Sequence, residues 1–187
     1  MKFTPLALAG AFAIDLERRS DERGFFARFW CAQELERAGL NAHIAQINTA
    51  VSTRAGTVRG MHLQVAPHAE VKIVRCLRGA VVDVIVDLRA DSPTYLKSCA
   101  VEIDAANGRM VYVPEGFAHG YQTLKDDTEL LYLTSHAYAP KHATGVRWDD
   151  PRFGIQWPLP ITSLSDQDRG WPDFDANHPI NLAGSQA

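Results

Sequence analysis

The sequence predicts an all-β protein, a sandwich or barrel built from short strands. Apolar and polar residues alternate from Val82 to Leu88, which is the clearest two-residue period in the chain. Other short runs of strand-forming residues follow at regular spacing, with turn-forming residues between them. This combination is typical of sheets that pack face to face or close into a barrel.

The composition is that of an ordinary globular domain. The chain has 187 residues, of which 46% are hydrophobic and 22% are charged, so it has enough apolar side chains to form a core. Its net charge of -3 and the absence of a basic block argue against a nucleic-acid partner. No apolar run has the length of a membrane span, so we expect no membrane partner.

The pattern of cysteines indicates a reducing compartment. Cys31, Cys76 and Cys99 form no close pair in the sequence. We therefore expect free thiols and a cytoplasmic location. No C-x-x-C motif occurs, which argues against a zinc site built on cysteines.

The N-terminal apolar run from Phe3 to Ile14 has two interpretations. It resembles a secretory signal, because Lys2 precedes it and small residues near its end mimic a cleavage site. Pro5 and Gly10 interrupt the run, however, and a single lysine is a weak positive charge for a signal. We therefore expect this run to be the opening strand of the fold.

Residues 15–39 carry three different patterns. The charged stretch 15–24 predicts a loop, and residues 32–39 predict a short helix that stops at a glycine. Between them lies an aromatic cluster that we expect to pack in the core or in an interface. Its members are Phe25, Phe26, Phe29 and Trp30.

From residue 44 onward the chain has the pattern of a β protein. The dipeptide Asn107-Gly108 predicts a hairpin between the strands on either side of it. We expect strands over 44–51, 71–77, 82–88, 96–103, 110–113, 121–124, 129–135 and 137–138.

The composition changes after Pro140, where prolines and tryptophans become frequent. We interpret this part as an irregular C-terminal tail that packs over the barrel, rather than as a second domain. The expected organisation is one domain over 1–187, with a core of about 40–140 and a tail over 141–187.

Two stretches contain the polar groups that enzymes use. The first, Val58–Gln64, contains a guanidinium, an imidazole and an amide, and Lys72 follows it in the next expected strand. The second, Gly108–Gly120, ends in a histidine and a glycine. We expect both stretches to line one pocket.

The glycine, proline and histidine spacing of the second stretch matches the second cupin motif, and residues 56–79 resemble the first. Metal-binding cupins use a His-x-His ligand pair, whereas this chain has His62-x-Gln64, and an amide is a poor ligand for a transition metal. Glu70 and His119 remain as ligands for a metal-dependent cupin oxygenase or isomerase. That alternative stays open, as does a sugar-binding cupin without catalysis.

A more specific resemblance follows from an ordered set of motifs along nearly the whole chain. Through these motifs the chain resembles the dTDP-4-dehydrorhamnose 3,5-epimerase family of nucleotide-sugar enzymes. Each motif alone is weak, but their order is specific. They cover residues 21–26, 58–64, 72–76, 83–89, 91–94, 113–120, 148–151, 155–158 and 164–168.

The resemblance implies a cupin-type double-stranded β-helix (jelly roll) with short helices, without a metal or another cofactor, and usually a homodimer. It implies that the substrate is a dTDP-linked 4-keto-6-deoxy sugar. The reaction it implies is inversion of one or more carbons next to the C4 ketone, by proton abstraction and reprotonation.

The resemblance also implies catalytic roles. His62 corresponds to the base, and Tyr132 corresponds to the acid on the opposite face of the sugar, with Tyr138 as an alternative acid. Asp168 corresponds to the residue that orients the base. Lys72 corresponds to the residue beside the ketone oxygen, where a fixed ammonium would stabilise the enolate.

Further residues are expected to bind the substrate. Arg59 and Arg23 suit the diphosphate, because a guanidinium forms paired hydrogen bonds with phosphate oxygens. Gln46 and Asn48 have the amide groups that read a nucleotide base. We expect His119 to form a pocket wall, although a leftover metal ligand or a core histidine are alternatives. Phe26 and Tyr138 complete the expected substrate-binding set.

The chain departs from the family at four positions near these contacts, while all four expected catalytic residues are kept. Arg28 stands where a glutamate is common, Glu70 where a glutamine is common, and Leu133 where a lysine is common. Leu63 replaces an aromatic residue after the motif histidine. We therefore expect the proton-transfer chemistry to be kept, with the particular sugar and the number of inverted carbons left open.

Overall fold

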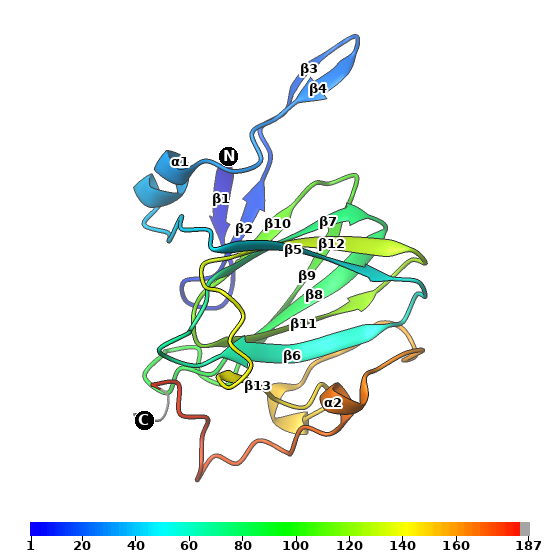
Figure 1. Cartoon of the computed structure of the whole chain (residues 1–187). Coiled ribbons are helices and arrows are strands. Elements are labelled where there is room, and N and C mark those ends of the chain that lie inside the picture. Colours follow the sequence, from blue (N-terminus) through cyan, green and yellow to red (C-terminus); the bar gives the residue numbers. More distant parts are fainter. Residues whose placement is uncertain (184–187) are drawn as a thin grey trace.

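The computed structural model describes residues 1–183, and two antiparallel sheets form the body of the protein (Figure 1). The six-stranded sheet has the order β1 (Lys2–Pro5), β2 (Phe12–Asp15), β10 (Met110–Val113), β7 (Lys72–Arg78), β12 (Thr128–Thr134) and β5 (Gln46–Ser52). The five-stranded sheet has the order β13 (Ala143–Gly145), β6 (Val58–Gln64), β11 (Phe117–Thr123), β8 (Ala80–Asp87) and β9 (Ser98–Asp104). The predicted all-β, jelly-roll fold class is confirmed.

The core lies between the two sheets. One cluster joins Val74 and Leu130 of the six-stranded sheet to Ile85 and Val101 of the five-stranded sheet, and each of these residues is buried. Burial of apolar surface on this scale is the main stabilising contribution to a sandwich of this kind.

A second cluster covers the outer face of the five-stranded sheet. It packs Val84 and Val86 of β8 against Phe153 and Phe174 of the C-terminal tail. Both faces of β8 are therefore buried, so the alternation seen in its sequence separates two apolar layers rather than core from solvent. The tail contains the 3-10 helix η1 (Pro151–Phe153) and the short helix α2 (Asp166–Arg169). Residues 184–187 of the expected tail lie outside the described residues.

The N-terminal apolar run forms two strands rather than one. β1 and β2 pair with each other, and β2 extends the six-stranded sheet by pairing with β10. The sandwich thus includes residues before the range of 40–140 that we expected for the core. The helix α1 (Ala32–Arg37) packs Leu35 in a third cluster beside β2.

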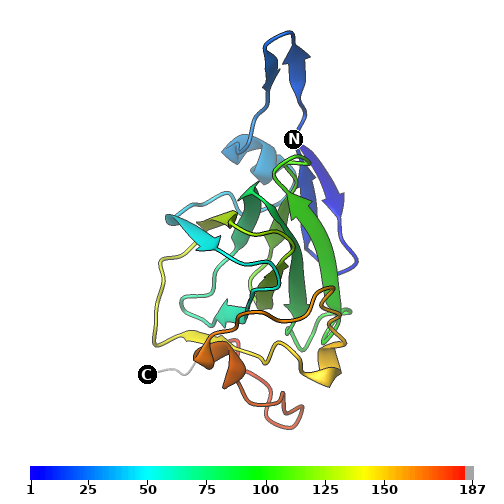
Figure 2. The ribbon, with the colours of Figure 1, turned by 90° about the vertical axis from the view of Figure 1, so that its right-hand side faces the viewer.

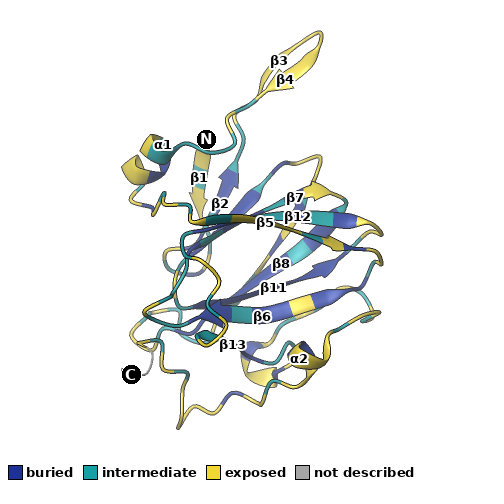
Figure 3. Ribbon diagram, in the orientation of Figure 1, coloured by how far each residue is buried: buried dark blue, intermediate teal, exposed yellow. Residues whose placement is uncertain are grey.

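The charged stretch expected to be a loop contributes to a protruding hairpin. Its strands are β3 (Arg19–Asp21) and β4 (Gly24–Phe26). Figures 1 and 2 show that this hairpin projects away from both sheets, at the end opposite α2. All six residues of the two strands are exposed, as Figure 3 shows.

Two predictions from local sequence are wrong. Asn107-Gly108 does form a turn, but it joins strands of different sheets: β9 pairs with β8, whereas β10 pairs with β2 and β7. The expected strand at residues 137–138 is a loop. None of the helices described in residues 1–183 has the length and apolar character needed to cross a membrane.

Candidate active site

Polar side chains from both sheets point into the interior at one end of the sandwich. Directly paired residues of antiparallel strands point to the same face of their sheet. In the five-stranded sheet, His62 of β6 is opposite His119 of β11. In the six-stranded sheet, Tyr132 of β12 is opposite Asn48 of β5 and Val74 of β7, and Val74 belongs to the core cluster.

The same register places two more of the expected residues on this inner face. Thr134 of β12 is opposite Gln46 on one side and Lys72 on the other. Because alternate residues of a strand share a face, Lys72 points to the same side as Val74. Strands β5, β6, β7, β11 and β12 therefore contribute polar side chains to this end of the interior.

A β-bulge in β6 brings Arg59 and His62 to one face. These residues are three apart, so a regular strand would point them in opposite directions. Across the strand, however, His62 pairs with His119 and Arg59 pairs with Tyr121, which are only two apart. The extra residue lies at Gly60, where φ is +136° and an added Cβ would lie 2.5 Å from Cα of Gly120. Bulges are frequent beside active sites for this reason.

The tail supplies a carboxylate to His62. Nε2 of His62 lies 2.5 Å from Oδ1 of Asp168, and Oδ2 of Asp168 accepts a hydrogen bond from the backbone N–H of Gly60 at 3.2 Å. Ser165 caps α2 and accepts a hydrogen bond from the backbone N–H of Asp168 at 3.0 Å. Burial opposes ionisation of Asp168, but its contacts with His62, Gly60 and Ser165 lower its pKa below the ordinary value.

Lys72 lies beside this pair. Its Nζ donates to the backbone carbonyl of His62 at 3.3 Å and lies 3.3 Å from Oε1 of Glu70. The side chains of Lys72 and Glu70 are 13% and 10% exposed, so this ion pair is shielded from solvent. A glutamine is common in the family at this position, so Glu70 places a carboxylate next to Lys72, whose ammonium is expected to bind the ketone.

Tyr132 is half-buried on the inner face of β12. Burial raises the pKa of its phenol well above the ordinary value, and the neighbouring Tyr121 and Asp83 raise it further, while Arg59 lowers it. The ring of His119 lies 6.1 Å from the ring of Tyr132, in an edge-to-face arrangement. A phenol in these surroundings keeps its proton at neutral pH, as a general acid requires.

His119 is a buried histidine with a carboxylate partner. It is 4% exposed, and its Nε2 lies 2.7 Å from Oδ2 of Asp83. It pairs across the sheet with His62 and lies beside the ring of Tyr132, but it lines none of the cavities described below, so its role as a pocket wall stays a prediction. With Glu70 paired to Lys72, neither alternative metal ligand lies free. Among residues 1–183, no group of three or more His, Cys, Asp or Glu side chains could hold a metal ion.

Adjoining cavities connect His62 to Tyr132. His62 and Lys72 line a cavity of about 200 Å³, and Tyr132 lines one of about 340 Å³ with Gln46 and Asn48. Glu70 and Tyr138 line both.

A third cavity, of about 400 Å³, extends from His62 and Asp168 to Arg59. The expected catalytic residues and Arg59 therefore border one connected series of cavities.

Tyr138 lies on a loop that neighbouring amides hold in place. Oε1 of Gln46 accepts a hydrogen bond from the backbone N–H of Tyr138 at 2.8 Å, and Oε1 of Gln64 accepts one from the backbone N–H of Ala139 at 2.6 Å. Nε2 of Gln64 donates to the backbone carbonyl of His68 at 2.9 Å. Gln64, which the sequence suggested only as a weak replacement for a metal ligand, ties together the loops that carry Glu70 and Tyr138.

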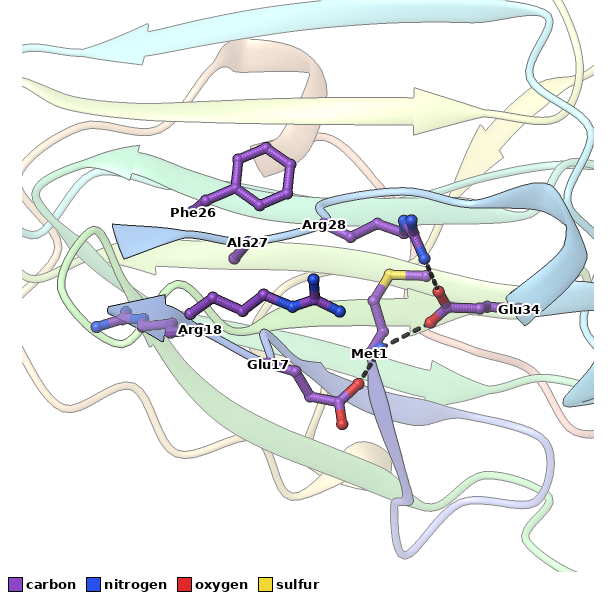
Figure 4. Close-up of a pocket in the computed structure, with 8 residues that line it drawn as sticks. Met1, Glu17, Arg18, Phe26, Ala27, Arg28 and Glu34 are labelled. Atoms are coloured by element: carbon purple, nitrogen blue, oxygen red, sulfur yellow. Dashed lines mark hydrogen bonds and ion pairs between the residues drawn. The ribbon is translucent and has the colours of Figure 1, made fainter. Parts of the chain in front are cut away.

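Two expected substrate-binding residues lie elsewhere in the chain. Arg23 and Phe26 belong to the protruding hairpin, where the Arg23 side chain is 82% exposed and Phe26 is 71% exposed. Phe26 lines a separate cavity of about 220 Å³ at the base of the hairpin, shown in Figure 4. There Arg28 pairs with Glu34 at 2.6 Å. One chain by itself does not bring these residues to His62.

Sequence reasoning missed three contributors to the site. Ser165 was overlooked, although Ser-x-x-Asp is a recognisable start of a helix. Ser52 and Tyr121 were overlooked because hydroxyl groups within apolar strands carry no distinctive sequence pattern. Both are buried, their oxygens lie 3.4 Å apart, and Oγ of Ser52 accepts a hydrogen bond from Nε of Arg59.

A jelly roll with an imidazole–carboxylate pair, an ammonium and a protonated phenol around connected cavities has the groups that an epimerase of the cupin class uses for proton transfer. The chain belongs to the dTDP-4-dehydrorhamnose 3,5-epimerase family, whose model matches residues 5–176. The resemblance indicated by the ordered motifs is thus confirmed, and the protein is an enzyme, an epimerase of the isomerase class.

Individual relatives agree with this assignment. The chain is 40% identical over 175 residues to the dTDP-4-dehydrorhamnose 3,5-epimerase of Sinorhizobium fredii, covering 93% of this chain and 90% of that protein. It is 38% identical to the structure of dTDP-4-dehydrorhamnose 3,5-epimerase from Bacillus anthracis with TDP and PPi bound, with a TM-score of 0.89 and coverage of 92% and 99%. It is also similar to a 3'-monoepimerase from Streptomyces bikiniensis in complex with dTDP-quinovose, at 37% identity, a TM-score of 0.83 and coverage of 90% and 86%.

Proposed function

We propose that this epimerase inverts one or more carbons next to the C4 ketone of a dTDP-linked 4-keto-6-deoxy hexose, with His62 as the base and Tyr132 as the acid. The observation that carries the proposal is the connected series of cavities that His62 and Tyr132 border from opposite sheets. Inversion requires a proton to leave one face of the sugar and another to arrive at the opposite face, so acid and base must flank the ring.

His62 is suited to remove the proton. Asp168 accepts a hydrogen bond from the distal nitrogen of its ring and stabilises the imidazolium that forms. The carboxylate is itself fixed by the N–H of Gly60, so the ring has one orientation and one tautomer available for the reaction.

Lys72 is suited to stabilise the enolate. Negative charge develops on the ketone oxygen as the proton leaves, and a positioned donor at that oxygen lowers the barrier by about 3–4 kcal/mol. Lys72 lines the cavity of His62, and among residues 1–183 the partners of its Nζ are Glu70 and the backbone carbonyl of His62. A ketone oxygen would add a further acceptor for the three N–H groups of the ammonium.

Tyr132 is suited to return the proton. Its raised pKa keeps the phenol protonated, and it borders the cavity on the sheet that faces His62. Tyr138 borders the same cavities but is 64% exposed on a loop, so its phenol is less firmly placed than that of Tyr132.

The nucleotide diphosphate of the substrate suits the polar residues that line the cavities. Arg59 is exposed in the cavity that reaches His62, and its guanidinium suits a diphosphate. Gln46 and Asn48 provide amides on the edge strand β5 for the base. The TDP and PPi bound to the Bacillus anthracis relative are ligands of this kind.

We further propose that the active form is a homodimer. The hairpin exposes Phe25 and Phe26 at 52% and 71%, and a partner chain would bury this aromatic surface. A hairpin that reached the partner's cavity would also bring Arg23 and Phe26 to a substrate, which they do not reach in their own chain.

Complementation tests the dimer. His62→Asn and Arg23→Ala are each expected to be inactive alone, because the first lacks the base and the second lacks a substrate contact. After mixing and subunit exchange, one site in each heterodimer would be intact, so activity should return to about a quarter of the wild-type value. A mixture that stays inactive after confirmed exchange would remove Arg23 from the partner's site.

We also propose a cytoplasmic location, because Cys31, Cys76 and Cys99 are all free thiols. Fractionation of the source cells tests this directly: recovery of the protein outside the cytoplasm would contradict it.

The central experiment is incubation with dTDP-4-keto-6-deoxyglucose in D₂O, followed by NMR. We expect deuterium at one or both carbons next to the ketone, together with inversion there. The spectrum identifies the inverted carbons. Absence of both exchange and inversion with folded protein would contradict the proposed substrate.

A further inference from the structure

The side chain of Arg59 is held by two residues of the other sheet. Its Nε donates to Oγ of Ser52 at 3.3 Å, and its Nη2 donates to the backbone carbonyl of Val51 at 3.1 Å. Arg59 belongs to β6 in the five-stranded sheet, whereas Val51 and Ser52 end β5 in the six-stranded sheet. A long side chain of an exposed residue is therefore fixed at two of its nitrogens.

These contacts leave Arg59 able to bind an anion. Within residues 1–183, the hydrogen-bond partners of its side chain are a hydroxyl and a backbone carbonyl, and neither is a carboxylate. A guanidinium has five N–H groups, and the two contacts occupy the one on Nε and one of those on Nη2. Both N–H groups of Nη1 and the second one of Nη2 remain, and such neighbouring donors form paired hydrogen bonds with phosphate oxygens.

Arg59 lies where two cavities meet. One cavity, of about 350 Å³, is also lined by Val51 and Ser52, and the other, of about 400 Å³, reaches His62 and Asp168. Arg59 lines both, so the two cavities are continuous at this residue. A diphosphate joined to a sugar beside His62 would meet the guanidinium at this junction.

Ser52 is buried although it contacts an exposed arginine. It is 3% exposed, and its Oγ also lies 3.4 Å from the phenol oxygen of Tyr121, which pairs with Arg59 across the five-stranded sheet. The hydroxyl can thus accept from Arg59 and donate to Tyr121. Because a buried hydroxyl with both of these partners has little freedom to rotate, it gives Arg59 a fixed anchor.

We propose that Ser52 is a positioning residue for the diphosphate of the substrate, because it holds the Arg59 guanidinium in a phosphate-binding orientation before the substrate arrives. A flexible arginine loses rotamer freedom when it binds, and a side chain that is already fixed avoids most of this cost. The diphosphate does not change during inversion, so Ser52 should affect binding and not the chemical step. The inference rests on the proposed function, in which Arg59 binds the diphosphate.

NMR titration of the whole protein with two ligands tests this role. One ligand is dTDP, and the other is thymidine, which has the same base and deoxyribose but no diphosphate. In Ser52→Ala we expect the Kd of dTDP to rise about three- to tenfold, whereas the Kd of thymidine should stay within about twofold of the wild-type value. With dTDP-4-keto-6-deoxyglucose as substrate, KM should rise about three- to tenfold while kcat stays within about twofold.

Further variants separate positioning of Arg59 from general packing. Adding Ser52→Ala to Arg59→Ala should weaken dTDP binding by less than about a further twofold, because the anchored group is already absent. Thr128→Val is the matched control and should bind dTDP as wild type does. Thr128 is directly opposite Ser52, is 1% exposed and donates its hydroxyl to the carbonyl of Lys125. Ser52→Cys, whose sulfur is a weak acceptor, carries the test if Ser52→Ala does not fold.

The outcomes separate this role from the proposed function. If wild type does not invert the sugar, the proposed function fails, whereas the dTDP and thymidine titrations still report on Ser52. If wild type inverts the sugar and Ser52→Ala binds dTDP as tightly as wild type, the positioning role is contradicted and the function stands. Equal losses for dTDP and thymidine, the same loss in Thr128→Val, a lower kcat with unchanged KM, or a further loss in the Arg59→Ala background would also overturn the positioning role.

Discussion

Oδ1 of Asp168 lies 2.5 Å from Nε2 of His62, although 106 residues separate the two along the chain. The contact exists because the tail returns across the five-stranded sheet, with Phe174 packed against its outer face. The proposed base is thus on the barrel, whereas the group proposed to orient it is on helix α2 of the tail.

Replacing Asp168 with asparagine tests this relationship. The amide keeps the shape but cannot stabilise an imidazolium, so we expect kcat to fall about 100-fold or more, with KM changed little. Steady-state kinetics with urea denaturation as a control for folding would measure the effect. A large rise in KM with an unchanged kcat would instead assign Asp168 to substrate binding.

Lys72→Met tests stabilisation of the enolate. Methionine keeps the length but removes the charge, and we expect kcat to fall about 100- to 1,000-fold. Glu70→Gln is the matched control, because it removes the partner at 3.3 Å and leaves the ammonium in place; we expect less than a tenfold change. Equal losses in the two variants would indicate that the ion pair is structural.

Gly60→Ala tests the bulge that aligns Arg59 with His62. The new Cβ would lie 2.5 Å from Cα of Gly120, a backbone atom, at a φ of +136°. We expect the free energy of unfolding to fall by at least about 2 kcal/mol. Gly24→Ala is the control, because φ is +128° there but no atom lies within 4 Å. If both variants lose a similar free energy of unfolding, the close contact of Gly60 with Gly120 of β11 does not account for the destabilisation.

His68 predicts a pH dependence of stability. Its ring lies 4.4 Å from that of His142 and 4.7 Å from that of His136. Burial lowers the pKa of His68, and the neighbouring histidines lower it further. The unfolded chain therefore binds a proton more readily, so stability should be lost as pH falls below about 6.5.

In His68→Asn that loss should be smaller, so the difference in melting temperature between pH 7 and pH 5 should narrow. His178→Asn is the control, because its ring is exposed and pairs with Asp175. An unchanged pH dependence in His68→Asn would show that the cluster does not titrate in this range.

Local sequence was a good guide to strands and a poor guide to their partners. Alternation located β8 and β12 to within a residue or two, because the two-residue period reflects the geometry of a single strand. Pairing depends on contacts between distant segments. For this reason Asn107-Gly108 suggested a hairpin, whereas the strands that flank it belong to opposite sheets.

In the candidate site, too, local sequence predicted some features, whereas others depend on contacts between distant segments. The motif around His62 was visible as a cluster of polar groups within an apolar strand, but the bulge that turns Arg59 to the same face depends on Gly120 of another strand. Composition alone would have left Asp168 in a surface turn, because its burial depends on packing of the tail. Only the ordered family motifs indicated its role before the fold was known.

The most direct test of the account follows deuterium exchange and inversion by NMR in His62→Asn and Tyr132→Phe, with dTDP-4-keto-6-deoxyglucose in D₂O. We predict that His62→Asn loses both, because no base removes the proton. Tyr132→Phe should retain exchange but lose inversion, because His62 can return a deuteron only to the face it deprotonates. Exchange at the wild-type rate in His62→Asn, or inversion at the wild-type rate in Tyr132→Phe, would contradict the assignment of base and acid to these two residues.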